Sequence, residues 1–474
     1  MISDNINVNK ENVKEIFNNT SDLVLYEFET LSNEKALIVY IDGIIDETKL
    51  DEDVLKPLTR DLVSIHDIRS TVHISKVKEI RDIKDTTMPI FQGGVVLFIE
   101  GLDIAYVFNL SQWTKRKIEQ PATERVIRGS KESFVEDIVV NRTLIRREIM
   151  NENLVFENYI LGEQTNTAVS LVYMDGIVKE EILEDLRNRI KEIKVDLVLD
   201  TGNIESYISE NTSKIVSTVG LTERADTVAG KILEGRIAIL CDGSPSALTV
   251  PKLFIETLHT TEDYYINPIF ATFLRLMRTF ALFMSFTLPS IYVSLILYHQ
   301  EMIPTELLMS IAGQREGVPL GTSLEALLLI LFFDLLREAT LRIPQALGEA
   351  VILVGGLVIG DAAVNAGVVS ATMIIVVAVT GVSEFVVSKF REEVPILRII
   401  FLFLGSILGL YGVSFGLIFL IIDLISLDSF GVPYMWPLAP YDRQGIKDTI
   451  LKTPLQKLEF RPEIMSNKDA RKRR

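Results

Sequence analysis

The feature that most constrains this chain is a series of apolar blocks between Thr279 and Ile425. The first block begins TFALFMSFTLPSIYVSLILYH, the last reads FLFLGSILGLYGVSFGLIFLIIDLI, and three more lie at about Leu320–Leu336, Ala346–Gly360 and Gly367–Val387. The hydrocarbon core of a bilayer takes about 20 apolar residues as a helix. Buried helices of a soluble protein show periodic polar faces, which these blocks lack. The sequence therefore predicts a polytopic α-helical transmembrane domain over residues 268–430.

Charge divides the 474 residues into three parts. Residues 1–267 carry 30 Lys and Arg against 46 Asp and Glu, a net charge of −16, and residues 268–440 carry a net charge of −5. Residues 441–474 carry a net charge of +5. The order is an acidic soluble region, a membrane domain and a basic tail. An acidic front half argues against nucleic-acid binding, which needs a basic footprint.

The front half also has the features of a cytoplasmic region. Its first twenty residues, MISDNINVNKENVKEIFNNT, contain no apolar core of a signal peptide. Cys241 is the only cysteine, so no intrachain disulfide is expected. The four histidines, at positions 66, 73, 259 and 299, lack ligand spacing, so neither a metal site nor a cofactor is expected.

Two pairs of segments indicate an internal repeat. ALIVYIDGIID at Ala36–Asp46 matches SLVYMDGIVKE at Ser170–Glu180, and GGVVLFIEG at Gly93–Gly101 matches GRIAILCDG at Gly235–Gly243. Each is an apolar strand that ends in an acid and a glycine, which is turn chemistry. We therefore expect tandem α/β cytoplasmic subdomains over residues 21–120 and 161–267, after a polar lead-in over residues 1–20.

The strand-end acids Asp42, Glu100, Asp175 and Asp242 lie where α/β enzymes place catalytic groups. No phosphate loop, nucleophile elbow or metal-ligand cluster accompanies them. Turns explain these acids without catalysis, so the sequence does not predict an enzyme.

Between the copies, residues 121–160 have apolar positions at helical spacing and predict a helical connector. Its basic residues form either a solvated linker surface or a contact surface for a neighbouring subunit. They are Arg125, Arg128, Lys131, Arg142, Arg146 and Arg147.

Basic residues beside the apolar blocks set the expected orientation. Arg275 and Arg278 precede the first block, so the positive-inside rule places them and residues 1–267 in the cytoplasm. Residues 298–321 are then an external loop, and the second block returns to Arg337 and Arg342. The basic tail, residues 431–474, is also expected in the cytoplasm.

Five simple crossings would leave that tail outside, so one block must behave differently. Residues 346–360 can be re-entrant, which gives four full spans, or residues 396–425 can form a hairpin broken at 409–412, which gives six. We favour the re-entrant segment, because each half of the last block is too short to span. Lys389 and Arg391 argue against it, because they would face outward.

Ionisable residues inside a bilayer are costly and usually mark a pathway. Glu325 and Glu349 are the better pathway candidates, because apolar residues flank both. Asp334, Arg337 and Glu338 share a helix face, on which Arg337 can pair with Asp334, and they form either an interfacial helix end or part of a pathway. Asp361 and Asn365 follow a segment rich in small residues, and Glu384 is a further intramembrane acid.

Glycines four residues apart allow helices to approach closely in lipid. The pairs are Gly356 with Gly360, Gly405 with Gly409, and Gly412 with Gly416. They indicate either tight packing within one subunit, or a pore lining or oligomeric seam with Asp361 and Asn365 as its polar points.

Three stretches together resemble a known family. YHQEMIPTELLMSIAGQREGVP, EALLLILFFDLLREATLRIPQALGEAVILVGGLVIGDAAVNAG and TERVIRGSKESFVEDI closely resemble the A subunit of the GerA-type spore germinant receptors, spore germination proteins of the GerA/GerK type. The similarity extends from the first α/β copy through the last apolar block. Asp334 stands where the family leads us to expect Glu, a conservative departure.

The resemblance implies a location, partners and a role. The location is the spore inner membrane of a bacterium of the Bacillota, in contact with membrane lipid. The implied partners are a transporter-like B subunit that recognises the nutrient and a lipoprotein C subunit. The implied role is a ring of A subunits that forms a nutrient-gated ion channel and starts germination.

Two other functions stay open. One is a signalling or scaffold subunit without its own pore. The other is a secondary transporter, which usually has repeated halves inside its membrane domain. Here the repeat lies in the soluble half, which weighs against a transporter.

Overall fold

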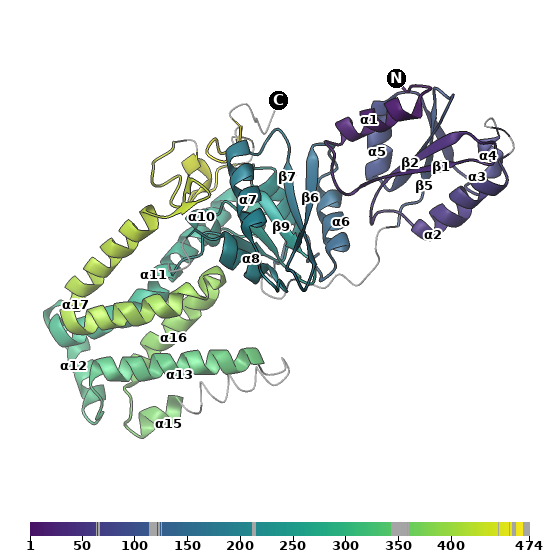
Figure 1. The fold of residues 1–474 in the computed structure, drawn as a ribbon. Coiled ribbons are helices and arrows are strands. Elements are labelled where there is room, and N and C mark those ends of the chain that lie inside the picture. The colour runs from purple at the N-terminus through teal and green to yellow at the C-terminus, as the bar shows by residue number, and fades with distance from the viewer. Residues whose placement is uncertain are drawn as a thin grey trace.

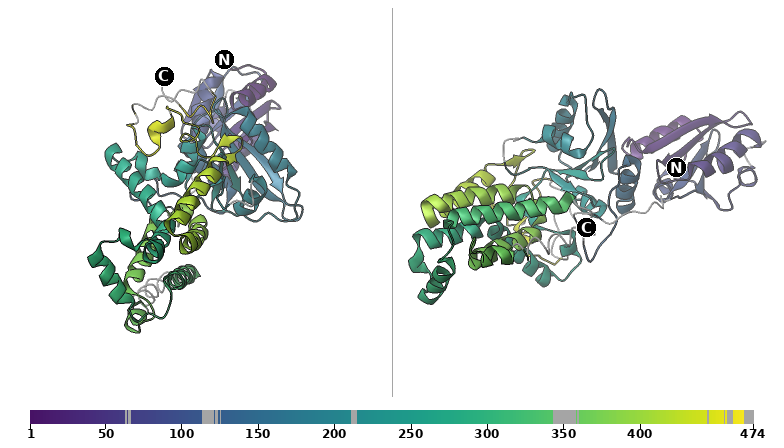
Figure 2. Two further views of the ribbon diagram at one scale, coloured as in Figure 1. Left: turned by 90° about the vertical axis from the view of Figure 1, so that its left-hand side faces the viewer. Right: turned by 90° about the horizontal axis from the view of Figure 1, so that it is seen from below.

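The computed structural model describes residues 1–62, 64, 67–112, 121, 124, 126–210, 215–342, 358, 360–443, 445–454, 456 and 461–467. The chain forms two α/β units, a helical bundle, and a C-terminal segment that returns to the second unit (Figure 1). The second unit lies between the first unit and the bundle, as the right-hand view of Figure 2 also shows.

The first unit is built on a five-stranded antiparallel sheet in the order β1-β2-β4-β5-β3. Its strands are β1 (Leu23–Glu29), β2 (Lys35–Ile41), β3 (Val77–Ile80), β4 (Gly94–Ile99) and β5 (Ala105–Asn109). Its helices are α1 (Ile6–Ile16), α2 (Glu47–Lys49), η1 (Leu50–Leu55), α3 (Lys56–Arg60), α4 (Ile68–Thr71), η2 (Ile83–Thr86) and α5 (Thr87–Phe91). Alternate residues of β2 point to opposite cores, as period-2 strand geometry requires: Leu37 joins one core and Ile38 the other.

The second unit repeats this plan, with a five-stranded antiparallel sheet in the order β6-β7-β9-β10-β8. Its strands are β6 (Leu154–Leu161), β7 (Thr167–Met174), β8 (Gly220–Thr222), β9 (Ile237–Cys241) and β10 (Ala247–Val250). Its helices are α6 (Ile138–Glu148), α7 (Glu180–Glu192), α8 (Thr201–Ile208), α9 (Ala225–Ile232), α10 (Phe254–Leu258) and η3 (Thr261–Tyr264).

The predicted repeat is confirmed by the strand order. The strands of the first matched pair, β2 and β7, both hold the second place in their sheets, and those of the second pair, β4 and β9, both hold the centre. The glycine that follows each strand-end acid has a positive φ, from 74° to 84°, at Gly43, Gly101, Gly176 and Gly243. A residue without a Cβ adopts this conformation most readily, so the turn interpretation of these dipeptides holds.

Two of the strand-end acids also have equivalent contacts in the two units. A carboxylate oxygen of Glu100 accepts a hydrogen bond from the backbone N–H of Ile6, the first residue of α1, at 2.9 Å. Asp242 does the same for Ile138, the first residue of α6, at 3.2 Å. These acids therefore satisfy helix N-termini, whose first N–H groups have no partner within the helix.

Two predicted boundaries are wrong. The lead-in over residues 1–20 is part of the first unit, because Val13 and Phe17 are buried in its core. In the described part of the connector over residues 121–160, α6 is the one helix, and the last residues of the connector form β6, the edge strand of the second sheet. The apolar positions at helical spacing lie mainly in α6, where Ile138, Leu144 and Ile145 are buried.

A buried arginine joins the two units. Arg146 of α6 is 1% exposed and donates to both carboxylate oxygens of Asp22, at 2.9 and 3.0 Å. Its guanidinium lies 5.7 Å from the Phe91 ring and 4.8 Å from the Phe156 ring. Three of the six basic connector residues pair within the chain, Arg142 with Asp42, Arg146 with Asp22 and Arg147 with Glu132. These three therefore have partners within the chain; Arg128 and Lys131 are exposed, and Arg125 lies outside the described residues.

The bundle contains α11 (Pro268–Tyr298), α12 (Thr305–Arg315), α13 (Thr322–Arg342), α15 (Gly360–Asn365), α16 (Ala371–Val386) and α17 (Glu393–Ile425), with short 3₁₀ turns at Gln300–Met302 and Ser388–Phe390. We call its ends proximal and distal by their distance from the second unit. α11 runs from proximal to distal. α13 and α16 run side by side in the opposite direction, from distal to proximal. Ser370, just before the start of α16, contacts Glu325 near the start of α13, and Glu384 near the end of α16 pairs with Arg337 near the end of α13.

α17 is a hairpin and not one straight helix. Gly409 has φ 61° and ψ −148°, which breaks the helix into two arms of about 16 residues, or roughly 24 Å each. Phe401 of the first arm faces Gly416 of the second. The chain on both sides of the hairpin reaches the same ring, because Phe390 and Tyr434 lie 5.8 and 6.2 Å from Phe254.

This hairpin is the alternative that the sequence analysis disfavoured. Its arms are short, as expected. The chain nevertheless reverses between them, because Gly409 adopts a positive φ that ends the first arm. The favoured re-entrant segment, Ala346–Gly360, lies outside the described residues except for 358 and 360. Arg342 ends α13 at the proximal end, and Gly360 begins α15 at the distal end.

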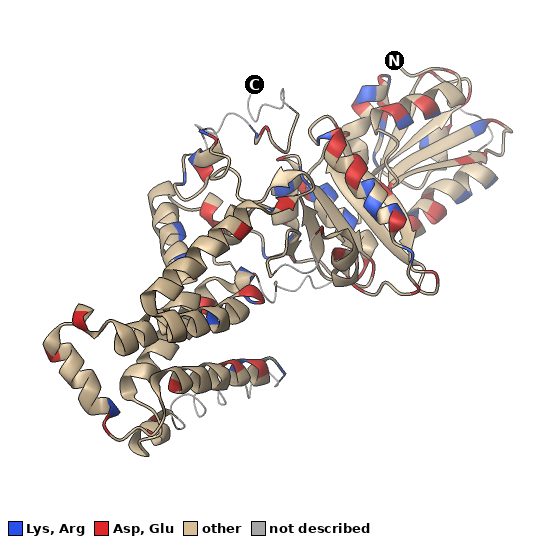
Figure 3. Cartoon of the chain, turned by 60° about the vertical axis from the view of Figure 1, so that its left-hand side comes forward, with Lys and Arg blue, Asp and Glu red and all other residues tan. Residues whose placement is uncertain are grey.

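The bundle surface is apolar. Most exposed large apolar side chains of the described chain lie between residues 269 and 425. Figure 3 shows charged residues concentrated on the two α/β units and sparse on the bundle. Two helices, α11 and α17, are long and apolar enough to cross a membrane, although α17 meets that test only as the sum of its two arms. The polytopic domain therefore stays a prediction.

The predicted basic tail is not a free tail. The described residues between 426 and 467 include β11 (Asp428–Ser429), β12 (Val432–Pro433) and η7 (Gly445–Asp448), and several of them contact the second unit. Ser429 accepts from the Lys252 backbone N–H and donates to the Thr218 carbonyl. Ser466 forms a β-bridge with Val178. The C-terminal segment and the second unit therefore lie on the same side of any membrane that the bundle crosses.

Candidate functional site: the polar core of the bundle and its junction with the second unit

Four charged side chains meet where α13, α16 and α17 pack together, and we call them the charge quartet. Arg398 of α17, 1% exposed, donates to Glu384 at 3.0 Å and to Asp334 at 2.6 Å. Arg337 forms an ion pair with the other oxygen of Glu384. Two acids and two guanidiniums give a net charge of zero, which is how charges are kept inside an apolar bundle.

The quartet differs from the expected pairing along one helix. Asp334 pairs with Arg398 and not with Arg337, three residues away, because the neighbouring helices bring stronger partners to both residues. Glu338 pairs with Arg342 on the exposed side of α13 and does not join Asp334. Sequence reasoning missed Arg398, although a lone arginine in the longest apolar block was a signal that a buried acid faces it.

A second polar group, the distal cluster, surrounds Glu325. Its carboxylate is fully buried and accepts from both the backbone N–H and the hydroxyl of Ser370, each at 2.6 Å. Ser370 is the N-cap of α16, so the carboxylate lies at the positive end of that helix. The other carboxylate oxygen, Oε2, has Arg315 at 3.9 Å and makes no hydrogen bond.

The remaining polar candidates are separate from these two groups. Asp361 accepts from Asn365 at 3.1 Å within α15. Glu349 and Gly356 lie outside the described residues.

The predicted glycines have three different roles. A Cβ on Gly405 would lie 2.2 Å from the Ser290 hydroxyl of α11, so this glycine permits close contact between α11 and α17. Gly409 forms the hairpin turn, and Gly412 and Gly416 face Leu404 across the hairpin. Among the described residues, a Cβ on Gly360 would meet Ile374 alone, at 4.0 Å.

The base of α11 is locked to the second unit by what we call the junction network. Asp263, fully buried, accepts from Arg275 at 3.2 Å and from Arg278 at 2.8 and 2.9 Å, as well as from Thr260. Arg275 also donates to Asp448 of the C-terminal segment at 2.9 Å. The two arginines used above to orient the chain are therefore bound by protein groups.

Burial alone would raise the pKa of Asp263, but the hydrogen bonds and charge of Arg278, with help from Arg275, lower it below its ordinary value. Nearby, burial and the charge of Arg275 lower the pKa of His259 to about 4. His259 is neutral at pH 7, and its Nε2 must carry the proton because it donates to the Thr449 carbonyl at 2.7 Å.

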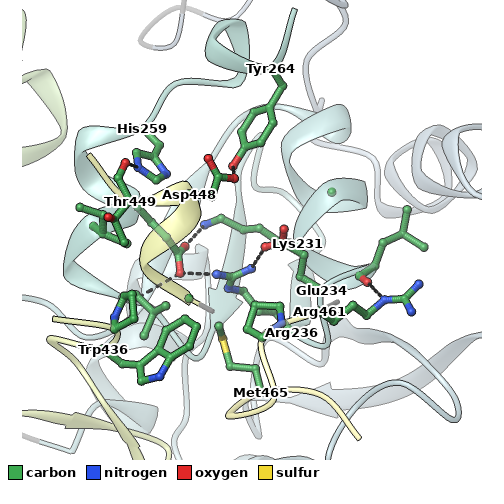
Figure 4. A pocket seen from close by; sticks show the side chains of 18 of the residues that line it. Lys231, Glu234, Arg236, His259, Tyr264, Trp436, Asp448, Thr449, Arg461 and Met465 are labelled. Atoms are coloured by element: carbon green, nitrogen blue, oxygen red, sulfur yellow. Dashed lines mark hydrogen bonds and ion pairs between the residues drawn. The ribbon is translucent and has the colours of Figure 1, made fainter. Parts of the chain in front are cut away.

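Beside this network is a cavity of about 1010 Å³ between the second unit and the C-terminal segment. Its lining, shown in Figure 4, includes Lys231, Glu234 and Arg236 of the second unit. The C-terminal segment contributes Trp436 and Met465. Glu256 binds both Lys231 and Arg236, at 3.2 and 2.7 Å. Because these wall charges neutralise one another, they do not provide a surface of a single sign. Within the described ranges, no three His, Cys, Asp or Glu residues are grouped as metal ligands.

The structure is that of an α/β protein: two antiparallel α/β units are fastened by buried ion pairs to a helical bundle that has an apolar surface and charges in its interior, and that contains two helices long and apolar enough to cross a membrane. This chain belongs to the GerA family: the description "Bacillus/Clostridium GerA spore germination protein" matches residues 11–464. The family predicted from sequence is thus confirmed.

The relatives cover nearly the whole chain. Spore germination protein KA of Bacillus subtilis (strain 168) is 37% identical over 479 residues, 99% of this chain and 88% of that protein. Spore germination protein GerLA of Bacillus cereus is 34% identical, over 97% of this chain and 95% of that protein. The uncharacterized membrane protein YfkQ of Bacillus subtilis (strain 168) is 36% identical, over 99% of this chain and 93% of that protein.

One solved structure is also similar, the N-terminal domain of the A subunit of the Bacillus megaterium spore germinant receptor GerK3. It is 28% identical and covers 53% of this chain and 97% of its own, with a TM-score of 0.41.

Proposed function

We propose that this chain is the A subunit of a nutrient germinant receptor in the spore inner membrane, and that it assembles into a ring that forms a nutrient-gated ion channel. A transporter-like B subunit and a lipoprotein C subunit are its proposed partners. The observation that carries the proposal is a bundle with an apolar surface and ionised groups buried inside. Membership of a family of spore germination proteins supports the same role.

The contacts narrow the set of candidate lining residues. Asp334 and Arg337 are each occupied by an ion pair, so we assign them to the stability of the bundle. Glu325 keeps one unbonded oxygen, and Asp361 and Asn365 bond only to each other among the described residues. A ring of subunits would bring several copies of such groups together, as acidic rings do in cation channels.

Glu349→Gln tests the lining role of the residue that lies outside the described ranges. The change removes the charge and keeps the shape, so we expect spores with normal receptor levels that release monovalent cations more slowly after nutrient addition. Cation release is followed by flame photometry, with Glu301→Gln, an exposed acid near the distal end, as the control. Release at the unmodified rate would remove Glu349 from the lining, and loss of the receptor from the membrane would make it a packing residue.

A second candidate function, a signalling or scaffold subunit, is favoured by the quartet, because its charges are satisfied within one chain. Ion flux through the purified chain in liposomes separates the two functions. Flux of monovalent cations supports the channel, and its absence with the partner subunits also present supports the scaffold.

The topology makes a separate prediction: both termini are cytoplasmic. Cys241 is buried, so single cysteines introduced at exposed positions report the accessible side of the membrane. We expect a membrane-impermeant thiol reagent to label Met309→Cys on α12 in intact protoplasts, and to label Val8→Cys and Tyr441→Cys only after permeabilisation. Labelling of Tyr441→Cys from outside would reverse the orientation.

A further inference from the structure

α12 is held only weakly by the rest of the bundle. Ile311 is its one buried side chain, and Leu307 and Met309 are 53% and 68% exposed. Its contacts with the rest of the bundle are concentrated at its C-terminal end, where the Thr372 hydroxyl donates to Gln314 at 2.6 Å and Arg315 approaches Glu325.

The contact between Arg315 and Glu325 is incomplete. Arg315 lies 3.9 Å from the Glu325 oxygen, within ion-pair range but too far for a hydrogen bond. That oxygen is buried without a hydrogen-bond partner among the described residues, and the Tyr292 side chain lies within electrostatic reach of both Arg315 and Glu325. A buried carboxylate oxygen without a hydrogen bond favours a rearrangement that brings water or a new donor to it.

Glycines lie on both sides of Arg315. Gly313 precedes it within α12 and Gly317 follows it, and a Cβ at either position would meet nothing within 4 Å. Packing therefore does not require these glycines. A glycine inside a helix weakens that helix relative to alanine, so the C-terminal turn of α12 is a place of low local stability.

We propose that Gln314 and Arg315 form a releasable clasp that holds α12 on the distal cluster in the resting receptor. Release of the clasp would uncover Glu325 and free Ser370 and the start of α16 to shift. α16 reaches the quartet at its other end through Glu384, so the clasp connects the distal face to the ion pairs of the bundle core. The inference rests on the proposed function and names the element through which the nutrient signal enters this chain.

The test uses spores whose only copy of this chain carries Arg315→Gln or, separately, Thr372→Val. Each change breaks one half of the clasp by different chemistry. We expect both to lower the nutrient concentration that gives half-maximal cation release, by about threefold to tenfold. Arg342→Gln is the matched control, because it breaks an exposed ion pair with Glu338 outside the cluster and should leave that concentration unchanged.

A double variant, Arg315→Gln with Glu325→Gln, distinguishes the clasp from independent effects. If the two residues act through one contact, the nutrient concentration for half-maximal cation release should shift in the double variant only as much as in the more strongly shifted single variant. Independent effects would multiply the two shifts. An unchanged or higher nutrient requirement at normal receptor levels overturns the clasp. Absence of both single variants from the membrane overturns it as well, because the contact is then part of the fold. If spores that lack this chain release cations normally on nutrient addition, the proposed function itself fails.

Discussion

Arg398→Met is expected to lower the free energy of unfolding by about 3–5 kcal/mol, because it leaves Asp334 in the bundle without its cation. Arg398 is 1% exposed and is the one residue that connects α17 to both α13 and α16 through ion pairs within the described chain. Methionine fills similar space without charge. The measurement is the thermal unfolding midpoint of the purified chain in detergent, together with its level in membranes.

A compensating variant makes this prediction specific. Arg398→Met with Asp334→Leu removes one acid and one base and leaves the pair of Arg337 with Glu384 intact. Replacing a buried ion pair by apolar residues is often neutral, so the double variant should recover most of the stability. Arg342→Gln, which breaks an exposed pair, should cost at most about 1 kcal/mol. A double variant as unstable as Arg398→Met would show that the loss comes from packing and not from the unpaired acid.

Asp263→Ala is the second prediction with a large effect. The change leaves Arg278 without its carboxylate partner and deprives Arg275 of one of two, at a site where Asp263 is fully buried. We expect a loss of about 3–5 kcal/mol and release of the base of α11 from the second unit. Limited proteolysis of the purified chain between residues 258 and 270 reports that release, and Glu262→Gln is the neighbouring control. Unchanged protection there would mean that the C-terminal segment alone holds α11.

The pH dependence of this site follows from the lowered pKa of Asp263. A carboxyl whose pKa is lower in the folded state stabilises the fold fully above its unfolded pKa, about 3.9, and loses that contribution as the pH falls through the folded value. The native chain should therefore lose stability below about pH 4. The Asp263→Asn variant should lose less stability over the same pH range, because asparagine has no carboxylate to protonate at that position.

The sequence by itself determined the features that depend on neighbours along the chain. Apolar blocks predicted helices with apolar surfaces, and α11 follows the first block closely. Matched strands predicted the repeat, and an acid followed by glycine predicted four turns, whose glycines have positive φ in the structure. Family membership also followed from residues read in order. These features are readable because period, turn conformation and motif are set by residues a few positions apart.

The tertiary structure decided which distant residues meet. It paired Asp334 with Arg398 instead of Arg337, because electrostatic pairing in the bundle depends on which helices pack side by side. It folded the last block back at Gly409, since a glycine permits a reversal but only the packing of both arms makes it favourable. It also returned residues 426–467 to the second unit, where Arg275 and Asp448 pair across 173 positions. Partner choice over such separations is a property of the packed fold, and no local pattern encodes it.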